Sequence, residues 1–127
     1  MADYQTAMPV PTESVEQQRL FQWARMASGA HPELRLMYKI PNEGKRTRAG
    51  GGRMLAEGLK KGVPDICLPV ARGGCHGLYI ELKRTRDSRV TQEQLEWIDA
   101  LKDQGYAAAV CRGCDEAIAL IVDYLKG

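Results

Sequence analysis

The residue types best suited to chemistry in this chain are two acids and a lysine, Asp65, Glu81 and Lys83. Carboxylate oxygens are ligands that Mg²⁺ prefers, and a bound Mg²⁺ usually keeps several waters that a substrate phosphate can replace. A lysine beside the metal can hold a phosphate oxygen, stabilise charge that develops on phosphorus, or lower the pKa of an attacking water. The three residues therefore indicate metal-dependent phosphodiester hydrolysis, provided that the fold brings them together.

A β-hairpin is the local structure that would bring them together. Alternating apolar residues predict strands at Asp65–Val70 and Leu78–Lys83, and the glycines of the loop 71–77 allow the backbone to reverse. A turn centred in this loop places Asp65 across from Leu82, between the acid and the lysine of the second strand. Because side chains alternate along a strand, that acid and that lysine share one face, and the apolar residues point the other way.

The motifs around this hairpin resemble those of a known nuclease group. A Pro-Asp followed by a Glu-x-Lys at the end of the next strand resembles the PD-(D/E)XK superfamily. Further matches resemble the VRR-NUC group within it, notably its small stand-alone phage and bacterial members, and cover about Glu13 to Leu125. The matching motifs are Gly62-Val63-Pro64-Asp65, Glu81-Leu82-Lys83, Thr91-x-x-Gln94 and Gly105-Tyr106.

The resemblance implies a metal site with a defined set of ligands. Asp65 and Glu81 would bind Mg²⁺, for which Mn²⁺ would substitute, and the backbone carbonyl of Leu82 would be a further ligand. Nuclease members commonly place a glutamate of the first helix near this site. Glu16 is our candidate for that residue, and Glu13 competes with it.

Two more residues of the expected site have roles of their own. Lys83 would act as an electrophile or activate the water. Gln94 has two interpretations: it either completes a capping box with Thr91 at the start of a helix, or points its amide at the active site or at a DNA phosphate.

The remaining elements complete an α/β fold. The sequence predicts a loose tail at residues 1–12 and one domain at residues 13–127, with its helices and strands in the order αβββαβα. The resemblance implies the restriction endonuclease-like αβββαβ core, with a mixed central sheet flanked by helices. The expected elements are a helix capped by Ser14 that ends near Gly29, a strand Leu34–Ile40, a helical patch Met54–Leu59, a helix from Thr91 to Gly105, a strand Ala107–Cys111 and a helix Asp115–Leu125.

Composition sets the remaining expectations about class and location. The chain has 127 residues, of which 44% are hydrophobic, and carries a net charge of +2. It has neither a long apolar run nor a signal-peptide pattern, so we expect a cytoplasmic protein. Cys111 and Cys114 form a single CxxC without a second pair, which favours free thiols over a zinc site. His31 and His76 are expected at the surface.

Positive charge is concentrated on both sides of the expected site in the sequence. Residues 41–61 hold six Lys or Arg against two acidic residues, a distribution that favours a polyanionic partner, with solvated loops as the alternative. The candidate DNA-binding residues are Lys45, Arg46, Arg48, Arg53, Lys60, Lys61, Arg84 and Arg86.

These observations predict a Mg²⁺-dependent, structure-selective DNA endonuclease. By the resemblance, its substrate would be branched DNA such as four-way (Holliday) junctions, and a homodimer would supply the two sites needed to cut two strands. Trp97, Tyr106 and the apolar side of the last helix are the candidates for its interface. The alternative from another class is a noncatalytic nucleic-acid-binding module, in which the two acids only pair with Lys83.

Overall fold

The computed structural model describes residues 9–41 and 48–127, and the side chains of residues 48–51 are outside that description. None of the helices in this part of the chain is long and apolar enough to cross a membrane. The elements, in chain order, are α2 (Glu13–Ala27), the 3₁₀ helix η1 (Pro32–Leu36), β1 (Tyr38–Lys39), α3 (Arg48–Ala56), β2 (Ile66–Leu68), β3 (Leu78–Lys83), α4 (Gln92–Asp103), β4 (Ala107–Arg112) and α5 (Cys114–Lys126).

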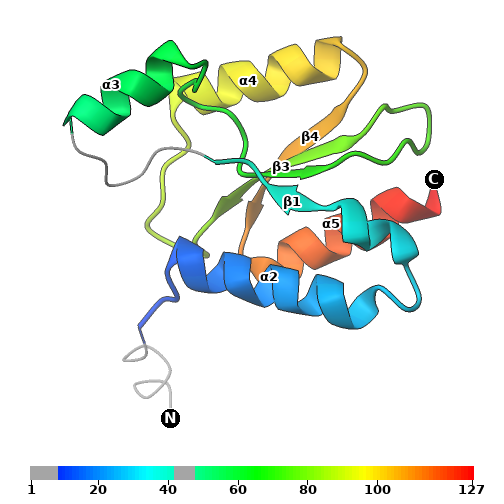
Figure 1. Cartoon of the computed structure of the whole chain (residues 1–127). Helices are drawn as coiled ribbons and strands as arrows, with labels where there is room; N and C mark the ends of the chain where they lie inside the picture. The colour runs from blue at the N-terminus through cyan, green and yellow to red at the C-terminus, as the bar shows by residue number, and fades with distance from the viewer. Residues whose placement is uncertain (1–8, 42–47) are drawn as a thin grey trace.

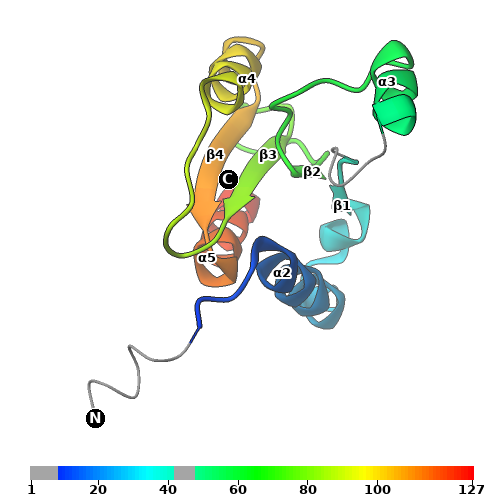
Figure 2. The ribbon, with the colours of Figure 1, turned by 90° about the vertical axis from the view of Figure 1, so that its left-hand side faces the viewer.

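A four-stranded mixed sheet forms the centre of the molecule. Its order is β1-β2-β3-β4, in which β1, β2 and β3 are successively antiparallel and β4 is parallel to β3. Both views place α4 and α3 on one side of the sheet and α2 and α5 on the other (Figures 1 and 2). The prediction of an α/β fold with a mixed sheet between helices is confirmed.

Alternation along β3 separates an apolar face from a polar one. Leu78, Ile80 and Leu82 are fully buried and belong to the hydrophobic core formed with α2 and α5. The intervening residues Glu81 and Lys83 point to the opposite face, which α4 covers. Their burial needs a reason, because charged side chains are almost never fully buried unless they are paired.

The register of the hairpin differs by one residue from the prediction. Its tip pairs Arg72 with Cys75, as expected for a turn centred on Gly73 and Gly74. The strands, however, pair Leu68 with Leu78 and not with Tyr79. Between the tip and the paired segment, the first strand therefore holds residues 69–71 and the second strand only residues 76–77, one residue fewer.

A tight turn at Pro69 accommodates the extra residue. The Val70 N–H donates to the Leu68 carbonyl at 2.8 Å, which closes a three-residue turn around the proline. Because Pro69 has no N–H to donate to a strand partner, the loss of one ladder position costs little there. Continued by one residue beyond the pair of Ile66 with Ile80, this register sets Asp65 opposite Glu81 instead of Leu82, and both carboxylates line the same hollow.

Three predicted element boundaries were wrong. The segment predicted as the strand Leu34–Ile40 begins as η1, with Pro32 in its first turn, and only Tyr38–Lys39 pairs with β2. The helical patch lies earlier, in α3. Thr12, not Ser14, caps α2: its hydroxyl accepts from the Val15 N–H at 3.2 Å, so the helix begins at Glu13.

Candidate active site

Two of the predicted acids, Asp65 and Glu81, line a hollow at the end of β3. Its volume is about 320 Å³, and polar side chains from α2, β1, β3 and α4 surround it. We call it the acidic hollow; its lining residues are Glu13, Ser14, Gln17, Lys39, Asp65, Glu81, Leu82 and Gln94. The fold thus brings Asp65, Glu81 and Leu82 together, as the sequence predicted, with Gln94 beside them, whereas Lys83 and Glu16 do not line the hollow.

Asp65 is held between two strands. Its Oδ2 accepts from the Leu82 N–H at 2.9 Å, and its backbone carbonyl accepts from the Ile40 N–H at 2.7 Å. In a strand the carbonyl of a residue leaves on the same edge as its N–H, so the Leu82 carbonyl also faces the Asp65 side. This places the carboxylate and a backbone carbonyl at one edge of β3, both available to the acidic hollow.

Glu81 has one occupied and one open carboxyl oxygen. Its side chain is 2% exposed. Oε2 accepts from the Gln94 amide nitrogen at 3.1 Å and lies 3.5 Å from the Lys83 ammonium nitrogen. Oε1 is buried without any hydrogen-bond partner among the described residues. A buried oxygen without a donor is costly, so either a proton shared with the Asp65 carboxyl or a bound cation in its place would be stabilising here.

Burial raises the pKa of both acids. Burial first, and the Asp65 carboxyl second, raise the pKa of Glu81 to about 8, although Lys83 lowers it. Burial also raises the pKa of Asp65, against the lowering effect of the hydrogen bond from Leu82. At neutral pH the isolated protein therefore keeps a proton on the pair, because two neighbouring buried carboxylates repel each other. A divalent cation in place of that proton would remove the repulsion.

The donor set fits Mg²⁺. Within the part of the chain that the structure describes, no cluster of three or more His, Cys, Asp or Glu side chains is arranged for a metal. Two carboxylates and a backbone carbonyl are a smaller set. That smaller set is typical of Mg²⁺, which is usually bound by one or two carboxylates, substrate phosphates and its own waters.

Gln94 satisfies both interpretations at once. Its Oε1 accepts from the Thr91 N–H at 2.9 Å, and its backbone N–H donates to the Thr91 hydroxyl at 3.2 Å, which completes the capping box. The other half of the same amide, Nε2, donates to Glu81. The start of α4 therefore fixes the amide that orients the buried carboxylate.

The two acids of α2 point in different directions. Glu16 is 4% exposed, and its Oε1 accepts from the Cys114 N–H at 3.0 Å, so it contacts the N-terminus of α5. Glu13, not Glu16, lines the acidic hollow; it accepts from the Ser88 hydroxyl at 3.1 Å, and its charge contributes to raising the pKa of Asp65. With Thr12 as N-cap, Glu13 is the first residue of α2 and not a residue before the helix, as the cap at Ser14 had implied.

The candidate DNA-binding residues fall into separate groups. Arg53, Lys60, Lys61 and Arg86 are exposed. Arg84 is partly buried, and its guanidinium donates to the Val10 carbonyl at 3.3 Å. Lys45 and Arg46 lie outside the described residues, and Arg48 is the first residue of α3.

Lys39 lines the acidic hollow and was missed by the sequence analysis. The sequence feature that could have indicated Lys39 is its position near the end of the first predicted strand, the part that pairs with β2 in the structure. Nothing in its spacing from the hairpin indicated that β1 would reach the acids.

The interface candidates make contacts within the chain. The Trp97 indole N–H donates to the Lys61 carbonyl at 3.0 Å, and the Tyr106 ring packs edge to face on His76 and Tyr79. The apolar side of α5 lies in the core, where Ala117 and Ile121 are fully buried. Ala117 and Ile121 are therefore not available to a partner, and the interface itself stays a prediction.

Comparisons with known proteins agree with this geometry. The model of the VRR-NUC domain family matches residues 8–115. A solved structure described as a VRR_NUC domain protein is 29% identical, with a TM-score of 0.79 over 94% of this chain and 92% of its own. The search of curated proteins gave no match. The chain belongs to the VRR-NUC domain family, and its fold is the restriction endonuclease-like fold of that nuclease-type family.

Proposed function

We propose that this protein is a Mg²⁺-dependent DNA endonuclease. The observation that carries the proposal is the buried Glu81 carboxyl, which has an unpartnered oxygen and a raised pKa and lies beside Asp65 and Lys83. A noncatalytic binding module has no need for two acids that repel each other in a partly buried hollow. The family membership adds that DNA is the substrate of such a domain.

The residues of the expected site then have distinct tasks, and Lys83, which does not line the acidic hollow, lies beside Glu81. Asp65, Glu81 and the Leu82 carbonyl would hold the ion, which supplies charge neutralisation at the scissile phosphate and a more acidic water. Lys83, which is 6% exposed, would place a desolvated positive charge where negative charge develops. Gln94 orients Glu81.

Two further residues act at the mouth of the acidic hollow. Lys39 would contact a phosphate oxygen, since it is an exposed cation among acids. We assign the auxiliary acid of the first helix to Glu13, because it lines the acidic hollow and Glu16 does not.

Substitution of the acids tests the proposal. Purified protein should nick or cut branched DNA with Mg²⁺ or Mn²⁺ and stop in chelator. Glu81→Gln and Asp65→Asn should each abolish cleavage and preserve DNA binding, because they remove metal ligands without adding charge. Glu96→Gln is the matched control, since Glu96 is an exposed acid of α4 outside the hollow. Undiminished cleavage by a folded Glu81→Gln or Asp65→Asn variant would contradict the assignment.

We further propose that a homodimer acts on branched DNA, such as four-way junctions. The described part of one chain holds one such site, and symmetric cutting of two strands needs two sites related by a twofold axis. Light scattering and a comparison of junction with linear duplex as substrates test this. A monomer that cuts linear duplex as readily as a junction would refute the dimer and the branched substrate, and would leave the nuclease proposal intact.

A further inference from the structure

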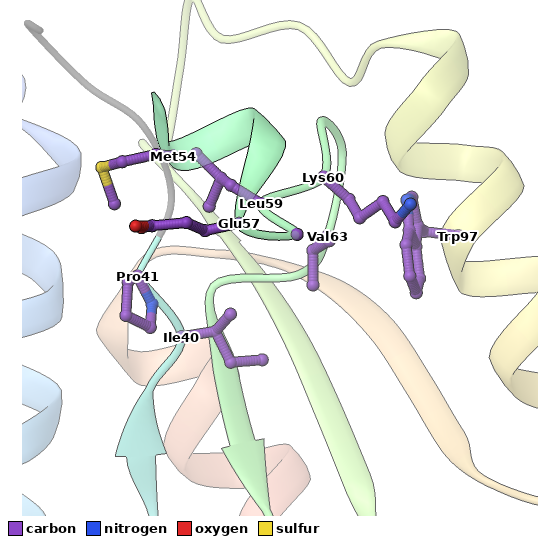
Figure 3. A pocket seen from close by; sticks show the side chains of 9 residues that line it. Ile40, Pro41, Met54, Glu57, Leu59, Lys60, Val63 and Trp97 are labelled. Carbon is purple, nitrogen blue, oxygen red and sulfur yellow. The ribbon is translucent and has the colours of Figure 1, made fainter. Parts of the chain in front are cut away.

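A second hollow, apolar in character, lies next to the acidic hollow. Its volume is about 470 Å³, within the range typical of small-ligand sites. Figure 3 shows side chains from three parts of the chain around it, with Trp97 on one side and the segment after β1 below. We call it the apolar hollow; its main lining residues are Ile40, Pro41, Met54, Leu59, Val63 and Trp97.

The two hollows share their walls. On the strand side, Lys39 lines the acidic hollow and the next residue, Ile40, lines the apolar one. On α4, Gln94 lines the first, and Trp97, one turn further on, lines the second. The Ile40 N–H donates to the Asp65 carbonyl at 2.7 Å, which joins the walls directly. The apolar hollow therefore lies next to the place where Asp65 would meet a phosphate.

The chemistry of the apolar hollow suits a flat, apolar ring. The indole N–H of Trp97 donates to the Lys61 carbonyl at 3.0 Å, which fixes the orientation of the ring. Aliphatic side chains make up most of the remaining wall. Aromatic and aliphatic side chains beside a nuclease site are the surroundings in which unstacked bases bind.

The charged residues of the apolar hollow indicate which part of a nucleotide would lie outside it. Lys60 lines the apolar hollow, and its side chain extends towards Trp97 (Figure 3). Arg53 and Lys61, close to Lys60 in the sequence, are also exposed. The one acid among the lining residues is Glu57. This pattern favours a nucleotide whose phosphate lies outside the apolar hollow, on Lys60, and whose uncharged base lies inside it. An apolar peptide would gain nothing from the cation.

We propose that the apolar hollow binds an unpaired nucleobase of the DNA strand, next to the phosphate that is cut. The inference rests on the proposed nuclease function and adds a reason for substrate selection. A paired base must first leave its stack and its partner, whereas a base at a branch or mismatch has already done so. Stacking on Trp97 would then favour DNA with unpaired nucleotides, without reading their sequence.

Binding to three matched DNAs tests the inference. The first is a duplex with one unpaired adenine, the second carries an abasic residue at that place, and the third is fully paired. Binding is measured in chelator with the full chain, so no cleavage occurs. We expect the unpaired adenine to be bound about tenfold more tightly than the abasic residue, since one stacked base contributes on this scale.

Variants of α4 separate stacking from structure. Trp97→Ala should reduce the adenine-to-abasic ratio to about one. Trp97→Phe keeps an aromatic ring but loses the hydrogen bond to Lys61, and should retain most of the ratio. Leu95→Ala is the matched control, because Leu95 is 43% exposed on the same helix and does not line the hollow. Thermal unfolding confirms that each variant is folded.

Each other outcome overturns the inference. A ratio near one in the unaltered protein, or a ratio that survives Trp97→Ala, shows that no base occupies the apolar hollow. A loss of dimer mass with Trp97→Ala, at an unchanged ratio, shows that a second copy covers it. Cleavage of the same DNAs with Mg²⁺ is scored separately: if cleavage is absent and the ratio is retained, the nuclease proposal fails and the base site does not.

Discussion

Replacing Glu81 with Gln should change how the stability of the metal-free protein depends on pH. In the folded chain burial and Asp65 raise the pKa of Glu81 to about 8, whereas its ordinary value is 4.5. Between these values the folded state holds a proton that the unfolded state has released. The free energy of unfolding of the unaltered protein therefore falls as pH rises through this window, and the loss ends near pH 8.

The size of the effect follows from one proton. A difference of one bound proton changes the free energy of unfolding by about 1.4 kcal/mol per pH unit. Between pH 6 and 7 the contribution of Glu81 should therefore approach about 1.4 kcal/mol. Glu81→Gln removes the titrating group and keeps an oxygen that accepts from Gln94, so the variant should lose most of this slope and exceed the unaltered protein in stability at pH 8.

Urea unfolding in chelator, at several values between pH 5.5 and 8.5, measures these slopes. Glu96→Gln, in which an exposed acid is changed, should leave the slope unaltered. Mg²⁺ added at pH 8 should stabilise the unaltered protein and have little effect on Glu81→Gln, because a ligand that binds only the folded state stabilises it. An equal slope in the unaltered protein and in Glu81→Gln would refute the reasoning that burial holds a proton on this residue.

Three further predictions concern neighbouring groups. Gln94→Ala and Thr91→Ala should each lose about 1 kcal/mol of stability in thermal unfolding, since each removes one of the two hydrogen bonds of the capping box. Only Gln94→Ala should lower cleavage, by about 10- to 100-fold; equal cleavage by the two variants would contradict this. Glu16→Ala should lower the free energy of unfolding by about 1–3 kcal/mol without changing the Mg²⁺ affinity measured by calorimetry. Glu13→Gln should weaken Mg²⁺ binding and leave the free energy of unfolding within about 0.5 kcal/mol of the unaltered protein. The reverse pattern would restore Glu16 as the auxiliary acid of the first helix. Replacing three cations before and at the start of α3 with alanine should lower the slope of log DNA affinity against log salt concentration by up to about three units. An unchanged slope would show that these cations do not contact DNA phosphates. Those cations are Lys45, Arg46 and Arg48.

Much of the site could be predicted because its parts are local. The order of Asp65, Glu81 and Lys83 along two short strands is a matter of alternation and turn chemistry, which neighbouring residues determine. The capping box at Thr91 is equally local, since it needs only two residues three positions apart. The α/β order of elements followed from the same kind of pattern, apart from the short β1.

Other features depended on contacts between distant residues. The one-residue shift that sets Asp65 opposite Glu81 arises at Pro69, and the pairing strands decide on which side of the turn the extra residue lies. Glu16 shows the same limit. Its place on the buried stripe of α2 was readable, but its partner is the Cys114 N–H at the start of a helix near the other end of the chain.

The sequence by itself thus determined which chemical groups are present and which faces of the local elements they occupy, because helix and strand periods are properties of the backbone. Only the tertiary structure decided which groups meet. Gln94 reaches Glu81 because α4 packs over the polar face of the sheet, and Lys39 joins the acids because β1 pairs with β2. The burial that raises the pKa of Glu81 and leaves one oxygen without a partner is likewise a result of packing, since desolvation requires the whole fold around the carboxyl.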